Sequence, residues 1–143
     1  MADENKATVR RLYEEAVNQG NLAVIDEIYS PDVELHLQGA PEDPFGPAQV
    51  RRLIEMMRSG FPGLTATVED MIAEHDKLVV RVTFQRPHDG RFIGVSPRSP
   101  RAAWTRIEIF RLFRGRIIEQ WSDRDDFALL QQLGVALPPL QPD

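Results

Sequence analysis

The chain has 143 residues and a mass of 16.3 kDa, with 42% hydrophobic and 27% charged residues. This is the size of one domain and the composition of a globular protein, which excludes wholesale disorder. The absence of cysteine excludes disulfides, thiolate metal sites and cysteine nucleophiles. The net charge of −5 argues against general nucleic-acid binding, because such binding needs a basic surface.

The sequence also bears on location and cofactors. No apolar run is long enough to span a bilayer, and the N-terminus lacks the basic region and apolar run of a secretory signal. We therefore expect a cytoplasmic protein, with one domain over residues 1–137 and a proline-containing tail over residues 138–143. Histidines at metal-ligand spacing, a phosphate loop and a dinucleotide fingerprint are all missing from the sequence, so we expect neither a metal nor an organic cofactor.

The first elements have the apolar spacing of helices. Apolar residues recur at helical spacing from Val9, and Gly20 is placed to end this first helix. Asn21 is expected to cap a short second helix that carries Tyr29. Residues 30–32 contain a proline and are expected to break this second helix.

A short strand and a third helix follow. Residues 33–37 alternate as a strand, and residues 39–47 form a loop with three prolines. Pro47 suits the first position of a helix. The apolar face of this third helix is formed by Val50, Leu53, Ile54 and Met57.

Beyond residue 63 the apolar period changes from helical to two, which predicts strands. The four strands are expected at about residues 65–74, 78–85, 102–113 and 116–123, with turns at 76–77, 88–90 and 114–115. Asp125 or Asp126 is placed to cap a last helix that ends at Gly134. Helices followed by an antiparallel sheet give an α+β layout.

Alternation along these strands predicts a shared polar face. Its expected members are Arg81, Thr83 and Gln85 on one strand, Trp104, Arg106, Glu108 and Phe110 on the next, and Gln120, Ser122 and Arg124 on the last. Large aromatic residues are a poor choice for open solvent, so a curled sheet would enclose them in an apolar cavity with a few polar groups. The alternative is that the polar side chains merely face water.

The residues from Arg81 to Arg116 include nine arginines and only two acids, Asp89 and Glu108. Such a stretch is either a solvated face of the sheet or a site for an anionic or oxygen-rich ligand. Glu108 is accordingly either a general acid or base, or the partner of Arg106 or Arg81 in a salt bridge. A buried carboxylate beside arginines is costly unless it is used or fully paired.

Six stretches of the sequence carry a family resemblance: VRRLYEEAVNQGNL, YSPDVELH, GFPGLTATVEDMIAEHDKLVVRVT, HDGRFIGVSP, WTRIEIFRLFRGRIIEQW and LLQQLG. Together they resemble the SnoaL-like polyketide cyclases of the nuclear transport factor 2-like superfamily, from about Asn5 to Gly134. The resemblance implies a cone-shaped α+β fold, in which N-terminal helices and a curved mixed or antiparallel sheet surround a pocket. It also implies a homodimer in many members and usually no cofactor.

The resemblance assigns roles to particular positions. The aldol cyclases of the family use a carboxylate on the last strand as general base, where this chain has Ser122 followed by Asp123, and a histidine partner where it has Glu108. In ketosteroid isomerase-like relatives, a protonated acid at the Glu108 position and a tyrosine at the Tyr13 position bind an oxyanion. Their base lies beside the position of His36, and an imidazole is a common general acid or base in enzymes.

Three further classes of relative suggest functions other than cyclisation. Limonene-type epoxide hydrolases need Arg-x-Asp on the middle strand and an acid on the last, where this chain has Arg81-x-Thr83 and Ser122, so two acids are missing. Cofactor-free hydroxylase-like proteins and non-catalytic small-molecule binders share the same scaffold. These three classes remain the alternatives to a cyclase.

We therefore expect a SnoaL-like cyclase or isomerase that acts without cofactor on a hydrophobic, oxygenated small molecule of the polyketide type. Glu108 and His36 are expected to do acid–base work, with Ser122 and Asp123 as further catalytic candidates. The residues expected to bind substrate are Tyr13, Phe45, Met57, Arg81, Thr83, Trp104, Arg106, Phe110, Gln120 and Arg124. The expected partners are this substrate and a second copy of the chain, with no nucleic acid and no membrane.

Overall fold

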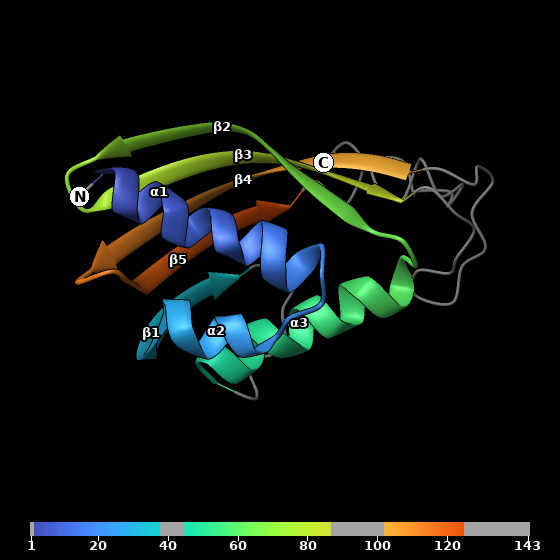
Figure 1. The fold of residues 1–143 in the computed structure, drawn as a ribbon, viewed down its shortest axis with the longest axis horizontal. Coiled ribbons are helices and arrows are strands. Elements are labelled where there is room, and N and C mark those ends of the chain that lie inside the picture. The colour runs from blue at the N-terminus through green and yellow to red at the C-terminus, as the bar shows by residue number, and fades with distance from the viewer. Residues whose placement is uncertain (1, 38–44, 87–101, 125–143) are drawn as a thin grey trace, which may run out of the picture.

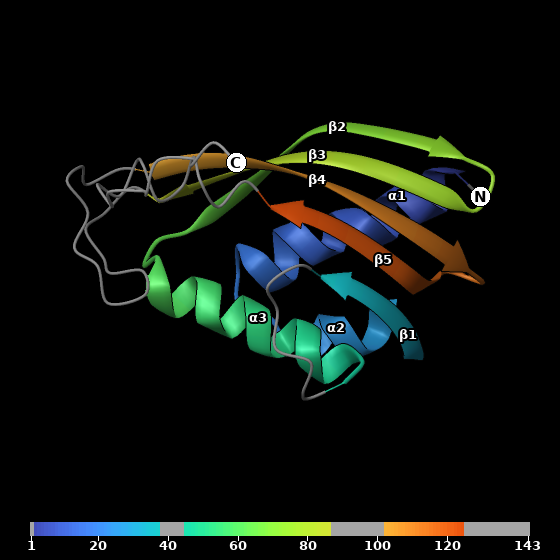
Figure 2. The same ribbon diagram turned by 180° about the vertical axis from the view of Figure 1, so that it is seen from behind.

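The computed structural model describes residues 2–37, 45–86 and 102–124. In this part of the chain, the helices lie on one face of a curved sheet of five strands (Figures 1 and 2). A helix or sheet with one apolar face must bury that face against another element, and here the helices and the sheet bury each other's apolar faces. The predicted α+β class, with N-terminal helices on a curved mixed sheet, is confirmed.

The first helix changes its hydrogen-bond pattern along its length. Helix α1 (Ala2–Arg11) continues into η1 (Leu12–Val17), a π-helical segment in which the N–H of Asn18 bonds the carbonyl of Tyr13 at 2.9 Å. Such single wide turns inside helices are rare and often occur at functional sites. The predicted stop at Gly20 is confirmed, since its φ of 74° is a left-handed conformation that glycine adopts without strain.

The next two elements correct the sequence prediction. Helix α2 (Ala23–Ile28) begins after Leu22 and has no side-chain cap, so Asn21 contributes only its backbone carbonyl. Strand β1 (Tyr29–Leu37) includes residues 30–32, which we expected to form a break. The reason is that β1 lies at the edge of the sheet, where a proline costs no ladder hydrogen bond, and its register shifts between Tyr29 and Glu34.

The remaining described elements agree with the predictions, except that the turn expected at residues 76–77 lies one residue earlier, because Lys77 already pairs with Glu74 in the sheet. They are α3 (Pro47–Gly60), β2 (Thr65–Glu74), β3 (Lys77–Arg86), β4 (Ala102–Phe113) and β5 (Arg116–Arg124). The strand order is β1-β5-β4-β3-β2, with β1 parallel to β5 and the other pairs antiparallel. The predicted turn at 88–90, the last helix and the tail lie outside the described residues.

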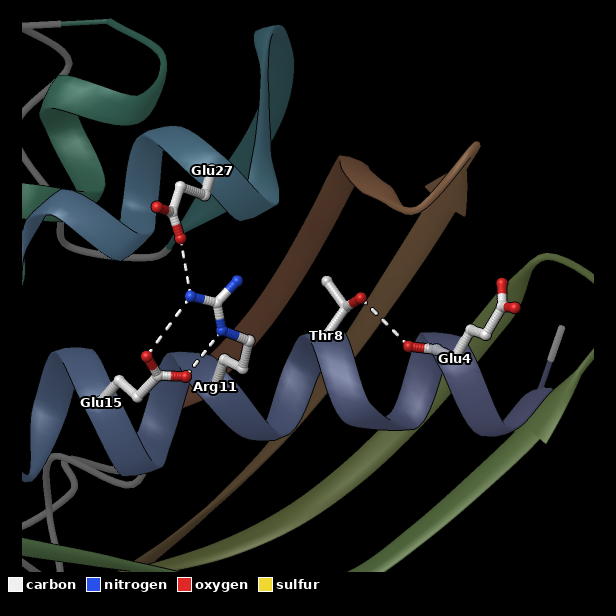
Figure 3. Close-up of polar contacts among 5 residues, drawn as sticks. All are labelled: Glu4, Thr8, Arg11, Glu15 and Glu27. Atoms are coloured by element: carbon white, nitrogen blue, oxygen red, sulfur yellow. Dashed lines mark hydrogen bonds and ion pairs between the residues drawn. The ribbon is translucent and has the colours of Figure 1, made fainter.

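Charged side chains form ion pairs between the helices. The guanidinium of Arg11 reaches Glu15 on η1 and Glu27 on α2, each at 2.6 Å (Figure 3). All three side chains are partly exposed, so this network contributes little stability by itself. None of the described helices has the length and apolar character that a membrane span requires.

A second set of contacts holds the end of η1. Arg58 of α3 donates to the carbonyl oxygens of Val17 and Asn18, at 2.5 and 3.2 Å. The side-chain amide of Asn18 bonds both backbone groups of Ala66 on β2, at 2.6 and 3.0 Å. These contacts fix the π-helical segment between α3 and the sheet.

Candidate functional site

A pocket lies between the helices and the inner face of the sheet. It encloses about 620 Å³ of empty space, a volume that includes open solvent at its mouth. Its lining is Leu12, Tyr13, Val17, Tyr29, Leu37, Val50, Leu53, Ile54, Met57, Phe84, Arg106, Glu108, Gln120 and Ser122. The helices supply mostly apolar side chains, and β4 and β5 supply the charged and amide groups.

Strand register explains why the polar groups of the pocket gather. Glu108 on β4 pairs with Ser122 on β5, and Phe110 pairs with Gln120. Paired residues project to the same side of a sheet. Glu108, Gln120 and Ser122 are therefore buried together on the inner face, with exposed fractions of 3%, 5% and 6%.

Glu108 is held from two sides. The side-chain nitrogen of Gln120 donates to Glu108 Oε2 at 2.5 Å, and Arg106 Nη1 lies 3.7 Å from Glu108 Oε1. The Arg106 guanidinium also lies 5.0 Å above the ring of Phe84. The carboxyl group thus has an amide donor on one oxygen and a cation near the other.

Gln120 has a second buried partner. The hydroxyl of Tyr29 donates to Gln120 Oε1 at 2.5 Å, so both ends of the amide are engaged. Burial raises the pKa of Tyr29 well above 10.0, and the nearby negative charge of Glu108 raises it further. Tyr29 is therefore a neutral hydroxyl at physiological pH.

Two further donors face the pocket without a hydrogen-bond partner among the described residues. One is the hydroxyl of Tyr13, which lies close to the Glu108 carboxyl group but outside hydrogen-bond geometry, and the other is Arg106 Nε; both atoms are buried. Burial, and then the charge of Glu108, raises the pKa of Tyr13 well above 10.0, so its hydroxyl keeps its proton. Buried donors without partners are rare in proteins and costly. Their position predicts that the pocket receives an acceptor oxygen.

The structure brings together six of the residues predicted for the site. Tyr13, Met57, Arg106, Glu108, Gln120 and Ser122 all line the pocket. Trp104 and Phe110 are buried on the same inner face but do not line it. Trp104 packs on Phe61 and Phe84, with ring centroids 4.8 and 5.6 Å apart, so it supports the pocket wall.

Our prediction that Arg81 and Thr83 share a face with Glu108 is wrong. Arg81 pairs with Ile107, an outward residue of β4, and its side chain binds Asp70 at 2.7 Å. The inner residues of β3 are instead its apolar ones, and Val80 is the partner of Glu108. Because side chains alternate along a strand, a one-residue difference in register moved this whole set to the other face.

His36 also lies on the outer face, while its neighbour Leu37 lines the pocket. Its ring stacks on Trp121 at 5.4 Å, and its Nε2 lies 2.8 Å from Glu119 Oε2. With Glu34, these side chains place three potential metal-ligand atoms within 4.8 Å of one another. The His36–Glu119 ion pair accounts for the closest of these contacts.

Two other predicted residues are not brought to the pocket, and the side chain of a third is not among those the structure describes. Asp123 is exposed on the outer face, because the β4–β5 register is regular from Arg106 to Arg111 and no bulge turns the side chain inward. Phe45 is 79% exposed and lies apart from the lining. Arg124 ends β5, and its side chain lies outside the described residues.

Tyr29 is the polar pocket residue that the sequence analysis missed. Its helical spacing from the preceding apolar residues predicts a place on the apolar face of the second helix, which the proline-containing residues 30–32 are expected to end. The available signal was the apolar–polar alternation of Tyr29, Val33, Leu35 and Leu37 around that proline. An edge strand with a shifted register keeps Tyr29 pointing inward despite Pro31.

Comparisons with known proteins identify the family of this chain. The model of the SnoaL-like polyketide cyclases matches residues 7–133. The chain belongs to this family. Its fold is similar to that of IdmH, a candidate polyketide cyclase from Streptomyces antibioticus, at 31% identity over 92% of this chain and 99% of that one, with a TM-score of 0.80.

Two further structures of the same fold resemble this SnoaL-like chain. AclR, a candidate hydroxylase from Streptomyces galilaeus, is 29% identical over 94% of this chain and 98% of that chain, with a TM-score of 0.78. A candidate SnoaL-like polyketide cyclase from Jannaschia sp. CCS1 is 27% identical over 96% and 94%, also with a TM-score of 0.78. None of the curated proteins matches the chain significantly. The family resemblance inferred from the sequence is confirmed.

Proposed function

We propose that this protein catalyses a cyclisation or isomerisation of a hydrophobic, oxygenated substrate, a polyketide-type intermediate, with Glu108 as the base. The observation that carries the proposal is the position of Glu108. It is the only buried acidic side chain among the described residues, and it faces the pocket beside two unpartnered donors. A buried carboxylate next to donors that lack an acceptor is the arrangement that proton abstraction beside a carbonyl needs.

The proposed reaction starts at a carbon next to a substrate carbonyl. The C–H bond breaks, its proton passes to a carboxyl oxygen of Glu108, and the electron pair moves onto the carbonyl oxygen. The Tyr13 hydroxyl and Arg106 donate to this enolate oxygen, where the negative charge develops. In a cyclisation, the enolate carbon then bonds to a second carbonyl carbon of the same molecule, the π electrons of that carbonyl move to its oxygen, and this oxygen takes the proton back from Glu108. In an isomerisation, Glu108 instead returns the proton to a different carbon.

The apolar wall supports such chemistry in a second way. Val50, Leu53, Ile54 and Met57 project from α3 opposite the polar groups of the sheet. A flexible substrate packed against this wall loses most of its conformational freedom before the reaction. We propose that the wall folds the substrate into the shape that closes the ring.

The test is proton exchange on a simple ketone. 2-Tetralone is apolar and carries acidic protons next to its carbonyl, and their exchange for deuterium in D₂O is followed by proton NMR. We expect exchange above the buffer rate for the wild type, and a loss of at least ~100-fold in Glu108→Gln. The matched control is His36→Gln, an outer-face variant expected to exchange normally. An unchanged rate in Glu108→Gln would remove Glu108 as the base.

Two outcomes of the same experiment favour the alternatives. Binding of 2-naphthol, a stable analogue of the enol, without any exchange of 2-tetralone would favour a non-catalytic binding protein. Oxygen uptake in the presence of 2-tetralone would favour hydroxylation, the activity class suggested by the similarity to AclR. Both measurements use the wild-type protein.

We also propose that the protein is a homodimer that pairs through the outer face of the sheet. This face carries Ile72 and Ile107, with exposed fractions of 67% and 55%. Packing these side chains against a second copy of the chain would remove apolar surface from water. Sedimentation should give twice the mass of the chain, and Ile107→Arg should give the monomer. A wild-type monomer would refute this proposal.

A further inference from the structure

A line of three buried hydrogen-bonding side chains crosses the floor of the pocket. Tyr29 on β1 donates to Gln120 on β5, and Gln120 donates to Glu108 on β4, with both distances 2.5 Å. Their exposed fractions are 1%, 5% and 3%. Tyr29 is thus linked to the carboxyl group of Glu108 through one amide.

The amide of Gln120 has two orientations with opposite consequences. A carboxylate can only accept, so an ionised Glu108 requires the NH₂ of Gln120 toward it and leaves the amide oxygen toward Tyr29. A protonated Glu108 can donate, and it prefers the amide oxygen instead. The Tyr29 hydroxyl can donate or accept, but a phenol is a stronger hydrogen-bond donor than acceptor because its oxygen lone pair is delocalised into the ring, so its bond to the amide oxygen favours the first orientation.

We propose that Tyr29 is a positioning residue that acts through Gln120. By fixing the amide, it holds Glu108 in the ionised, proton-accepting form and makes the protonated form give its proton back readily. The role in turnover rests on the proposed function, whereas the effect on ionisation of Glu108 does not.

The other groups around Glu108 leave this role to Tyr29. Arg106 comes from the same strand and Tyr13 from η1, and each acts on Glu108 directly. Ser122 is its neighbour on β5, and Val80 faces it from β3 with no charge. Of these groups, Tyr29 is the one whose hydrogen bond to the Gln120 oxygen selects the orientation of the amide.

The test is a double-mutant cycle read by the ionisation of Glu108. The protein is labelled with ¹³C at the glutamate carboxyl carbons, and the Glu108 signal is assigned by its loss in Glu108→Gln. We expect Tyr29→Phe to raise the midpoint of its titration by about one pH unit, a tenfold change in the ionisation constant. Gln120→Met should raise it by at least as much, because it removes the amide donor.

The double variant decides whether Tyr29 acts through Gln120. If it does, Tyr29→Phe adds nothing in the Gln120→Met background. A full additional shift in that background, or an unmoved midpoint in Tyr29→Phe alone, would overturn the proposal. Because Tyr29→Phe removes one oxygen atom and leaves the ring, its NMR spectrum should keep the wild-type dispersion, and its single-variant result stands even if Gln120→Met folds poorly.

Turnover separates this proposal from the proposed function. The titration needs no substrate, so shifted midpoints without any exchange of 2-tetralone would support the positioning role and refute the reaction. Exchange that depends on Glu108, together with an unmoved midpoint in Tyr29→Phe, would do the reverse. If both hold, the acidic limb of the exchange rate should move to higher pH in Tyr29→Phe by the same amount as the midpoint.

Discussion

Two buried tyrosines allow a matched test of the unpartnered donor in the pocket. Tyr13 and Tyr29 are each 1% exposed, and both line the pocket. The hydroxyl of Tyr29 donates to Gln120, whereas that of Tyr13 has no hydrogen-bond partner among the described residues. The same change, tyrosine to phenylalanine, is therefore expected to have opposite effects on stability at the two positions.

The magnitudes follow from these contacts. A buried hydroxyl without a partner costs about 1–3 kcal/mol, so Tyr13→Phe should raise the free energy of unfolding by about 1 kcal/mol. Tyr29→Phe removes a hydrogen bond and leaves the oxygen of Gln120 without its donor, which should lower it by about 1–2 kcal/mol. The two variants should thus differ by about 2–3 kcal/mol.

Urea unfolding followed by circular dichroism measures both values, and the slopes of the two transitions should agree with the wild type. In thermal unfolding, 1 kcal/mol corresponds to a shift of roughly 3 °C for a chain of this size. Equal destabilisation by the two variants would refute the reasoning, because it would mean that the Tyr13 hydroxyl is already bonded in the free protein. Tyr13→Phe should also weaken binding of 2-naphthol by about two- to tenfold, since a hydrogen bond to a neutral oxygen contributes about 0.5–1.5 kcal/mol.

Three further predictions concern stability and binding. Gly20→Ala should lower the free energy of unfolding, measured in urea, by about 2 kcal/mol, because φ is 74° and a Cβ would meet the Arg58 guanidinium at 2.9 Å. The control is Gly115→Ala, where φ is 77° but a Cβ would have nothing within 4 Å, so it should cost about 1 kcal/mol. Stability should fall as pH rises above 10.0, because the two buried tyrosines lose their protons more easily in the unfolded chain, and Tyr29→Phe should reduce this slope by up to about 1.4 kcal/mol per pH unit. Met57→Trp should fill the pocket and weaken 2-naphthol binding at least about tenfold while the urea midpoint stays within error; unchanged binding would place the probe elsewhere.

The strands were predictable because alternation is a local property. Period-two patterns located four strands to within a residue or two, and the turn at residues 114–115 followed from its glycine. Strand β1 escaped because its proline reads as a break, and only its place at the sheet edge makes that proline harmless. Edge position depends on strand order, which local sequence does not contain.

The site was predicted in part for a related reason. On β4 and β5, the aromatic and polar residues of one face indicated correctly that Arg106, Glu108, Gln120 and Ser122 point the same way. On β3, both faces of the strand were plausible from the sequence alone. Choosing the polar face for the pocket put Arg81 with Glu108, although the register pairs it with outward Ile107.

The mistake on β3 bears on how the pocket works. With apolar Val80 opposite Glu108 and Arg81 outside, one arginine rather than two lies beside the carboxyl group. In the observed arrangement, Tyr13 and the Arg106 Nε remain without acceptors among the described residues, at a cost in stability that a bound acceptor oxygen would offset. The Tyr13 hydroxyl costs stability in the free protein and is also the donor expected to bind the enolate. Tyr13→Phe should therefore raise the free energy of unfolding and weaken binding at the same time.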